Sequence, residues 1–469
     1  MKVSREQRAS LFAWLQRLVG VGIVVTAIPA GINLFAMGVI PDKYLYIIAP
    51  LYAAVAGIVL WQLMRRSKAV WRGVLLVVIG MVMITVNVAV YKSGHSVNSF
   101  LNAVQPPQVN YVEYTVIAKK DHSVALDSAR SVGMVGADTL RDKAAKALAG
   151  VTPAAQSSYD SLMALTEQLN AGAVELASIR TANMGVLQEN YREFYDSVAT
   201  LATYKVRDDN RQAAPKTDVT KPFVLYISGI DTYGDVGEVS RSDVNMLAVM
   251  NPAKRTMLLV NTPRDYYVQL HGVAGMPDKL THAGIYGIDM SRQTLGDLYG
   301  VEIPYYVRLN FTSLVKMVDV VGDITVNSDY AFHSFQVGKN TLDSKRTLEF
   351  ARERYSFSDG DRQRGRNQQK VIEAIVAKMS EPRNLTRYNA ILSTLQSSLQ
   401  TNMSQETIAS LIKMQLNDFK GWKVESMSVD GAGATRQTYS MGAMPLYVMI
   451  PDSASVERAK ERIGEYLQS

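Results

Sequence analysis

The sequence predicts a membrane-anchored protein of the α/β class. We expect a layered α-β-α domain with a central mixed sheet, preceded by a small α+β accessory domain and three transmembrane helices. Three observations predict this arrangement. Three long apolar stretches occupy the first 92 residues, short apolar strands alternate with helical patterns after residue 221, and a charged, proline-containing segment precedes that alternation. With 469 residues, the chain is long enough for two or three domains.

Each apolar stretch has about the ~20 residues needed to cross the hydrocarbon core of a bilayer. The three stretches are residues 18–40, 44–64 and 73–91. Arginine and lysine are frequent in the N-terminal tail and in the connection 65–72, whereas the first connection has only Lys43 against Asp42. The positive-inside rule therefore predicts a cytoplasmic N-terminus and places everything after Lys92 outside the cell membrane.

Charge is concentrated in this predicted membrane segment. The formal net charge is +7, but residues 1–92 hold ten Lys and Arg against two Asp and Glu. The remaining 377 residues hold 40 basic and 41 acidic side chains and are nearly neutral. Nucleic-acid binding is therefore not expected. The chain has no cysteine, which excludes disulfides, thiolate metal sites and a cysteine nucleophile.

The exported region is expected to contain two domains. Residues 98–215 predict the accessory domain, with a strand at 109–118, a mostly helical pattern over 128–204, and then a charged linker. This part contains no motif with chemical meaning, so a spacer or interaction role is expected. Residues 216–469 predict the layered domain. Its expected strands are 223–231, 243–250, 256–265, 303–311, 422–429 and 446–450, and its expected helices are 280–300, 312–322, 344–354, 367–379, much of 388–416, and 455–467.

Charged side chains are expected at the ends of three neighbouring strands. Asp231 follows the first strand of the layered domain, Asp243 opens the second, and Arg264 follows the third. Functional groups in open α/β sheets gather at such ends. Two converging carboxylates can hold Mg²⁺ (or Mn²⁺), which typically binds one or two carboxylates together with substrate phosphates, and guanidinium groups can grip the remaining phosphate oxygens. Each residue taken singly could instead serve a turn or a helix cap.

An arginine cluster lies in the segment FARERYSFSDGDRQRGRNQQK at residues 350–370. Its five arginines are Arg352, Arg354, Arg362, Arg364 and Arg366. The first two are two residues apart, so both reach one site only at a frayed helix end or in extended chain. The last three align on one side if their segment is extended. Alternatively, the acidic residues Glu353, Asp359 and Asp361 neutralise the cluster, and it is a solvated run of ion pairs.

Other common chemistries are not indicated. The five histidines show no spacing typical of a zinc site, and His282 is interpreted as a helix-start residue rather than a base. The sequence has no G-x-S-x-G, Walker A or GxGxxG motif, which argues against serine-hydrolase, P-loop and dinucleotide chemistry.

Taken together, the motifs resemble the LytR-CpsA-Psr family of cell-wall phosphotransferases, particularly its capsule-type members with several membrane spans and an accessory domain. The motifs GID, RSD, PRD, KLTHA, VVGDITV, FARER and D-x-x-R-x-x-N-Q-Q occur in that order, and the catalytic-domain likeness spans about residues 223–379. The resemblance implies an Mg²⁺-dependent enzyme. It would take a glycan polymer, expected to be capsular polysaccharide, from an undecaprenyl-diphosphate carrier and attach it to peptidoglycan through a phosphodiester.

The resemblance also implies roles for individual residues. The metal-proximal carboxylates would be Asp231 and Asp243. The diphosphate would be clamped by Arg264, Arg352, Arg354 and Arg364, with Gln368 nearby, and Arg241, Lys279, Arg362 and Arg366 are assigned to the same lipid-diphosphate site. The polyprenyl tail would occupy an apolar slot that the sequence does not locate. Many members end this motif in Arg-Gln-Gln, whereas this chain has Asn367-Gln368-Gln369, so it stays open which of the three preceding arginines meets phosphate.

The expected partners are the lipid-linked donor, the peptidoglycan acceptor, the membrane and other membrane proteins of polysaccharide synthesis. Two alternatives to transfer stay open. The enzyme could release the glycan to water as a diphosphatase, or the protein could be a non-catalytic binder of lipid-linked glycans with a regulatory role. The sequence assigns neither the general base nor the task of the accessory domain.

Overall fold

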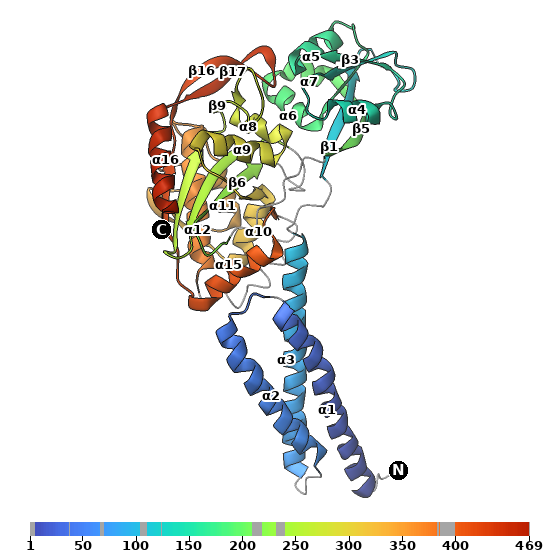
Figure 1. The fold of residues 1–469 in the computed structure, drawn as a ribbon, viewed down its shortest axis with the longest axis vertical. Helices are drawn as coiled ribbons and strands as arrows, with labels where there is room; N and C mark the ends of the chain where they lie inside the picture. The colour runs from blue at the N-terminus through green and yellow to red at the C-terminus, as the bar shows by residue number, and fades with distance from the viewer. Residues whose placement is uncertain are drawn as a thin grey trace. The chain divides into compact units, whose positions relative to one another are not determined.

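The computed structural model describes residues 5–36, 38–65, 70–103, 110–122, 124–208, 218–230, 240–381, 384 and 399–468. The chain divides into two compact units, whose elements are labelled in Figure 1. The first unit comprises residues 1–103, 380–396 and 404–420, and the second comprises residues 104–379, 397–403 and 421–469.

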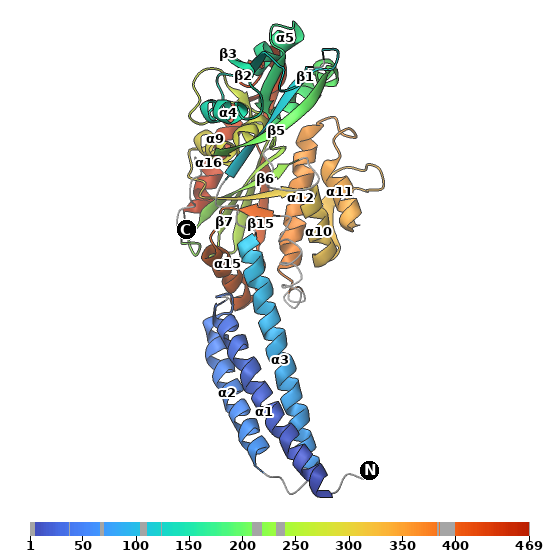
Figure 2. The same ribbon diagram turned by 90° about the vertical axis from the view of Figure 1, so that its right-hand side faces the viewer.

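The first unit consists mainly of three long helices (Figure 2). Its helices are α1 (Arg5–Ala36), α2 (Asp42–Met64), α3 (Val70–Ala103) and α15 (Gln405–Asp418). Segments 10–36, 42–64 and 70–97 are long and apolar enough to cross a membrane, as the sequence predicted. A Cβ atom on Gly80 would lie 2.4 Å from Val19 Cγ1, so the small residue permits the close approach of α1 and α3. The buried Asn87 accepts a hydrogen bond from Tyr52 (2.7 Å) and donates one to Thr26 (3.0 Å).

The second unit begins with a five-stranded sheet in the order β3-β2-β4-β1-β5. Its strands are β1 (Asn110–Lys119), β2 (Ser131–Val135), β3 (Ala155–Tyr159), β4 (Leu176–Arg180) and β5 (Val198–Asp208). The helices between them are α4 (Arg141–Leu148), α5 (Leu162–Asn170), α6 (Thr181–Asn190) and α7 (Arg192–Ser197). The domain boundary predicted at residue 216 lies outside the described residues, and the predicted domain limits stay a prediction.

The mostly helical pattern predicted over 128–204 is wrong, because three short strands alternate with the helices there. The strand β4 is buried at every position, and β2 is buried at its three central positions. Strands buried on both faces lack the polar alternation that marks a half-exposed strand. Short apolar runs of this kind cannot be told from buried helix by periodicity alone, which explains the error.

The layered domain is built on a six-stranded mixed sheet in the order β14-β11-β6-β7-β8-β15. Its strands are β6 (Phe223–Ile230), β7 (Val244–Asn251), β8 (Thr256–Thr262), β11 (Tyr305–Asn310), β14 (Leu399–Thr401) and β15 (Lys423–Ser428). The pairs β11–β6 and β8–β15 are parallel, and the other neighbours are antiparallel. The predicted central mixed sheet is therefore confirmed.

Helices cover both faces of this sheet (Figure 2). Alternate residues of β7 face opposite layers: Leu247 and Val249 pack in the cluster that includes Leu295 and Ile463, whereas Met246 packs in the cluster on the opposite face. On the first face lie α9 (Ile288–Tyr299) and α16 (Ser453–Leu467), and on the other α10 (Phe311–Val321), α11 (Ser344–Arg352) and α12 (Asp361–Met379). This two-residue alternation produces the predicted α-β-α layering.

Smaller elements complete the domain. They are β9 (Tyr267–Val268), β10 (Asp278–Lys279), α8 (Leu280–Ala283), η1 (Gly284–Tyr286), β12 (Ile324–Ser328), β13 (Gly338–Leu342), β16 (Gly431–Thr438) and β17 (Gly442–Pro451). The single helix predicted over 280–300 is interrupted at Gly287, whose φ of +108° is open to glycine and strained for other residues.

Candidate functional site

A cavity of about 650 Å³ opens beside the ends of β6 and β7, and residues of α10, α11 and α12 line its other side. The structure brings seven of the predicted site residues to this cavity: Arg241, Asp243, Arg264, Arg352, Arg354, Arg364 and Gln368. The remainder of its lining includes an apolar group: Ile227, Val244, Leu309, Leu314, Val371 and Ile372. The cavity therefore has both a charged and an apolar lining.

Strand pairing explains why Asp243 and Arg264 meet. The strands β7 and β8 are antiparallel, with Asn245 opposite Thr262. Asp243 stands two residues before Asn245 and Arg264 two residues after Thr262, so both extend from the same edge of the sheet. The backbone of Asp243 is fixed by a 2.8 Å hydrogen bond from its amide to the carbonyl oxygen of Gly229 on β6.

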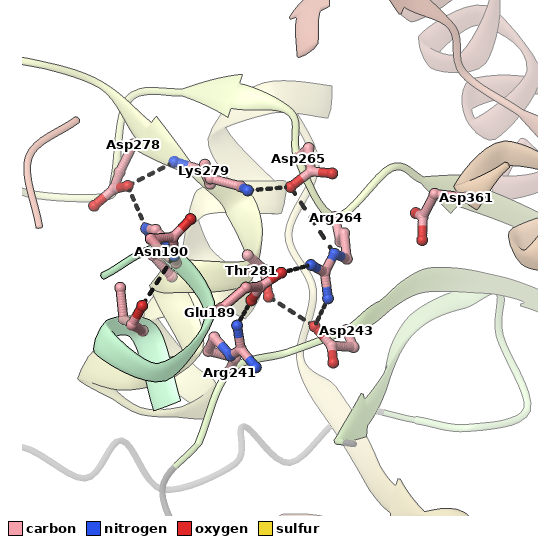
Figure 3. A network of polar contacts seen from close by, with 12 residues as sticks. Glu189, Asn190, Arg241, Asp243, Arg264, Asp265, Asp278, Lys279, Thr281 and Asp361 are labelled. Atoms are coloured by element: carbon pink, nitrogen blue, oxygen red, sulfur yellow. Dashed lines mark hydrogen bonds and ion pairs between the residues drawn. The ribbon is translucent and has the colours of Figure 1, made fainter. Parts of the chain in front are cut away.

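Arg264 lies at the centre of a network of ion pairs (Figure 3). Its Nη1 donates to Asp243 Oδ1 at 2.8 Å, and the Thr281 hydroxyl donates to the same oxygen at 3.1 Å. The Lys279 Nζ lies 2.5 Å from an Asp265 oxygen, which is 3.9 Å from Arg264 Nε. Lys279, which was predicted to bind the diphosphate, is not among the residues lining the cavity. It pairs with Asp265, which in turn lies beside Arg264.

A carboxylate from the accessory sheet's helices completes the network. Glu189, in the last turn of α6, forms ion pairs with both Arg241 and Arg264 and lines the cavity. Glu189 was not predicted from the sequence as a site residue. Its helix carries no motif, and nothing in the local sequence separates Glu189 from other glutamates in helices.

Burial and charge act in opposite directions on these groups. Burial alone would raise the pKa of Asp243, but the charges of Arg264, Arg241 and Arg364 and the Thr281 hydrogen bond outweigh it and lower that pKa. Asp243 is therefore ionised at neutral pH. Burial raises the pKa of Asp361, against the opposing effect of Arg364 and Arg264. Burial also lowers the pKa of Arg241.

Two arginines from the end of α11 line the cavity. Arg352 is the last residue of the helix, and its guanidinium lies over the Phe311 ring, 4.4 Å from the centroid. Arg354 follows two residues later and donates to the Tyr355 hydroxyl at 2.6 Å. The helix ends between the two residues, which allows both to reach one cavity although they are two positions apart.

The remaining arginines are separated by the helical turn of α12. The segment from residue 361 is helical, so the extended alternative does not apply and a spacing of two points the side chains apart. Arg364 lines the cavity and pairs with Asp361. Arg362 and Arg366 are not among the lining residues, and they pair with Asp430 (2.5 Å) and Asp359 (2.6 Å) instead. Part of the cluster is thus neutralised locally.

One of the two predicted metal ligands, Asp243, lies among the described residues. Asp231, predicted as a catalytic residue and a metal ligand, lies outside the described residues. Among the residues that the structure describes, no group of three or more His, Asp or Glu side chains is arranged to hold a metal ion. Asp243 is the predicted metal ligand that is present, and both hydrogen bonds described above are accepted by its Oδ1.

The variant Glu189→Gln is expected to strengthen the binding of pyrophosphate to the cavity about fivefold, on the order of 1 kcal/mol. The change removes a negative charge from Arg241 and Arg264 while keeping the size of the side chain. Isothermal titration with the full chain measures the effect. Glu167→Gln, on the exposed side of α5, is the matched control. If the Glu189 variant, but not the control, binds pyrophosphate more weakly than wild type, the expected electrostatic effect is contradicted. The carboxylate would then mainly position the two arginines.

The chain is similar to known proteins of one family. The LytR_cpsA_psr family matches residues 191–461, a range that starts just after Glu189. The polyisoprenyl-teichoic acid–peptidoglycan teichoic acid transferase TagU of Enterococcus faecalis is 34% identical over 209 residues, covering 43% of this chain and 68% of the relative. TagU of Bacillus cereus is 31% identical over 234 residues, covering 48% and 75%. The crystal structure of B. subtilis TagV is 25% identical, with a TM-score of 0.45 over 53% of this chain and 98% of TagV.

Proposed function

The chain belongs to the LytR_cpsA_psr family, and we propose that it transfers a glycan polymer from a polyprenyl-diphosphate carrier to peptidoglycan. The two TagU relatives are named as teichoic acid transferases that act between polyisoprenyl-teichoic acid and peptidoglycan. We propose undecaprenyl diphosphate as the carrier and capsular polysaccharide as the polymer. The three apolar helices and the five-stranded accessory sheet support the capsule-type proposal, since the sequence resembles members with that organisation.

The mixed charged and apolar lining of the cavity is the observation that carries this proposal. A polyprenyl-diphosphate donor joins a dianionic group to a long hydrocarbon chain. Arg264, Arg352 and Arg354 contribute guanidinium side chains to the lining, and Val244, Leu314 and the four other residues of the apolar group named above contribute apolar side chains. Guanidinium groups suit the phosphates, and the apolar side chains suit the prenyl chain, which gains from removal from water. A small polar substrate would have no use for the apolar part.

The proposed reaction is a phosphoryl transfer without a covalent enzyme intermediate. A hydroxyl oxygen of the acceptor forms a bond to the phosphorus next to the glycan. The bond between that phosphorus and the bridging oxygen of the diphosphate breaks, so polyprenyl monophosphate leaves. Arg264, Arg352 and Arg354 stabilise the negative charge that shifts to the leaving phosphate, and Arg364 and Gln368 support the same group.

The donor set at the polar part of the cavity suits a hard divalent cation. Asp243 is ionised, and both of its described hydrogen bonds involve Oδ1, so Oδ2 is the oxygen that we propose for metal binding. Asp243 and Asp231 would hold Mg²⁺ or Mn²⁺, which commonly binds one or two carboxylates and substrate phosphates. When bound, the cation supplies neutralisation of the diphosphate charge.

The membrane helices support a location beside the lipid-linked donor. The three helices are apolar along their spans, and many of their large side chains are exposed to the surroundings, including Val21, Ile32, Ile47, Leu51, Val78 and Val82. We propose the orientation that the positive-inside rule predicts, with the N-terminus in the cytoplasm and the catalytic domain outside. Anchoring in the membrane raises the effective concentration of a lipid-bound substrate.

Incubation of the full chain in lipid nanodiscs with a polyprenyl-diphosphate glycan, Mg²⁺ and peptidoglycan tests the proposal. Covalent, phosphodiester-linked glycan on peptidoglycan is expected. Release of free glycan alone would indicate a diphosphatase, and donor binding without any bond cleavage would indicate a non-catalytic binder. Either outcome would overturn the transfer proposal.

The variant Leu314→Gln tests the apolar part of the cavity in the same preparation. We expect about tenfold weaker binding of the polyprenyl-diphosphate donor and no change in pyrophosphate binding, because only the prenyl chain meets this side chain. Val337→Gln, at an exposed apolar residue outside the cavity lining, is the control. Equal loss of pyrophosphate binding by the Leu314 variant would show that the substitution distorts the whole site.

A further inference from the structure

A histidine–carboxylate pair lies in the cavity lining, and neither residue was predicted from the sequence. His333 Nε2 lies 2.8 Å from a carboxylate oxygen of Glu353, and both residues line the cavity. Glu353 stands between Arg352 and Arg354 in the sequence, so the pair is adjacent to two arginines that we assign to the diphosphate. None of the roles described above uses either residue.

The protonation of the pair follows from the state of the carboxylate. Burial alone would raise the pKa of Glu353, but its hydrogen bonds with His333 and with the Ser356 amide (2.8 Å) lower it. An ionised carboxylate only accepts hydrogen bonds, so Nε2 of His333 must carry the proton that it donates. The other ring nitrogen, Nδ1, is then the one with a lone pair available to accept a proton.

The backbone at His333 is held in an uncommon conformation. Its φ is +46°, a left-handed value that few residues other than glycine adopt, and such residues cluster at functional sites. The neighbouring Phe332 fixes the segment through ring contacts with Phe335 and Phe357, both with centroids 4.8 Å apart. The conformation is therefore supported by packing rather than left to solvent.

The exposure of the pair suits a large acceptor. The His333 side chain is 47% exposed, whereas Glu353 is 13% exposed. A hydroxyl group on a polymer such as peptidoglycan cannot enter an enclosed cavity, so a base that receives its proton has to be accessible. The more buried carboxylate orients the ring, and the more exposed ring meets the acceptor, which is the division of roles in a base–orienter pair.

We propose that His333 is the general base that deprotonates the acceptor hydroxyl and that Glu353 is the positioning residue that orients its ring. The inference rests on the proposed function. The acceptor O–H bond breaks, its proton passes to Nδ1, and its oxygen forms the bond to the phosphorus next to the glycan. The phosphorus–bridging-oxygen bond breaks, and polyprenyl monophosphate carries away the electron pair. The imidazolium then releases its proton to solvent.

The charges around the pair support this assignment. The hydrogen bond with Glu353 and the charges of Glu353 and Glu349 raise the pKa of His333, while Arg352, Arg354 and Tyr355 line the same cavity. A base must be unprotonated to act, so the transfer rate is expected to rise with pH through the His333 pKa. The midpoint is expected above the ordinary histidine value of about 6.5.

The variant His333→Asn tests the base directly, since asparagine tolerates a left-handed backbone but cannot take the proton. We expect kcat for transfer to fall about a hundredfold, the pH-dependent rise to disappear, and the donor Kd to stay within threefold. His271→Asn is the matched control, because His271 pairs with Asp297 at 2.7 Å, is 42% exposed and lies outside the cavity lining. Transfer within threefold of wild type by the His333 variant would overturn the proposal.

The variant Glu353→Gln separates positioning from a structural role. Loss of the carboxylate removes the charge that raises the His333 pKa, so the rising part of the rate–pH curve is expected to move to lower pH, with a maximal rate about tenfold lower. A rate curve that keeps its midpoint while thermal stability falls would mean that the pair is only structural. If wild-type protein cleaves the donor without attaching glycan, the proposed acceptor is wrong. The rates of donor cleavage by wild type and by the His333 and Glu353 variants then test the role of His333 independently of the acceptor.

Discussion

Replacing Arg264 by alanine is expected to abolish glycan transfer and to destabilise the catalytic domain. The residue is 7% exposed and donates to Asp243 at 2.8 Å, and it forms a second ion pair with Glu189. Its removal leaves the buried Asp243 without its main partner, which typically costs about 3–5 kcal/mol of unfolding free energy. The transfer rate is expected to fall on the order of 10³-fold, since a phosphate-binding group is lost as well.

Urea unfolding and the nanodisc transfer assay measure the two effects separately. Arg264→Lys keeps the charge but loses the planar fork, so it is expected to recover most of the stability and less than a tenth of the rate. Arg436→Ala is the control, because Arg436 is an exposed residue of β16 outside the cavity lining. An Arg264→Ala protein that transfers glycan within threefold of wild type would remove Arg264 from the proposed mechanism.

The variant Asp243→Asn is expected to reduce transfer about 10³-fold while keeping the side-chain size. The carboxylate is ionised, accepts hydrogen bonds from Arg264 and Thr281, and is the described residue that we propose as a metal ligand. A neutral amide cannot supply an anionic ligand. Transfer by the variant should therefore respond little to added Mg²⁺ or to its removal by EDTA, whereas wild type responds strongly. A normal Mg²⁺ titration of the variant would contradict the metal proposal.

The same variant is expected to change the acid sensitivity of the fold. The pKa of Asp243 is lowered in the folded protein, so its charge stabilises the fold above the ordinary value of about 3.9, and this contribution is lost as the pH falls through the folded-state pKa. Wild type should lose stability below about pH 4 more steeply than Asp243→Asn. The exposed Asp297→Asn, outside the cavity lining, serves as the control for both measurements.

Local patterns predicted the elements of the catalytic domain well. The strands β6, β7 and β8 and the helices α10, α11 and α16 lie close to their expected ranges, whereas α12 begins at Asp361, six residues before its expected start. Each of these segments has an apolar period of two or 3.6 residues, or a short apolar run bounded by turn residues, which distinguishes a strand from a helix. In the accessory sheet, β1 lies within one residue of its predicted range, but β2 and β4 were missed because they are short and buried. The break at Gly287 was missed because one glycine does not always end a helix.

The candidate site was predicted in its composition more than in its arrangement. The Asp243–Arg264 contact follows from strand ends that meet at one edge of the sheet. Which arginines of the cluster line the cavity depends on the secondary structure of residues 361–379. Because this segment is helical, Arg364 reaches the cavity, while Arg362 and Arg366 pair with surface carboxylates. An extended segment would have brought all three together.

The three apolar spans, the alternation of strands and helices, and the arginines and carboxylates at strand and helix ends could be predicted from local sequence. These features depend on the periodicity and charge of neighbouring residues. Which charged side chains contact one another depends on tertiary packing. Glu189 reaches Arg264 across 75 residues of sequence, and His333 reaches Glu353 across 20. Such contacts arise because separate helices and loops pack around one sheet, and the local pattern around any one residue does not encode that packing.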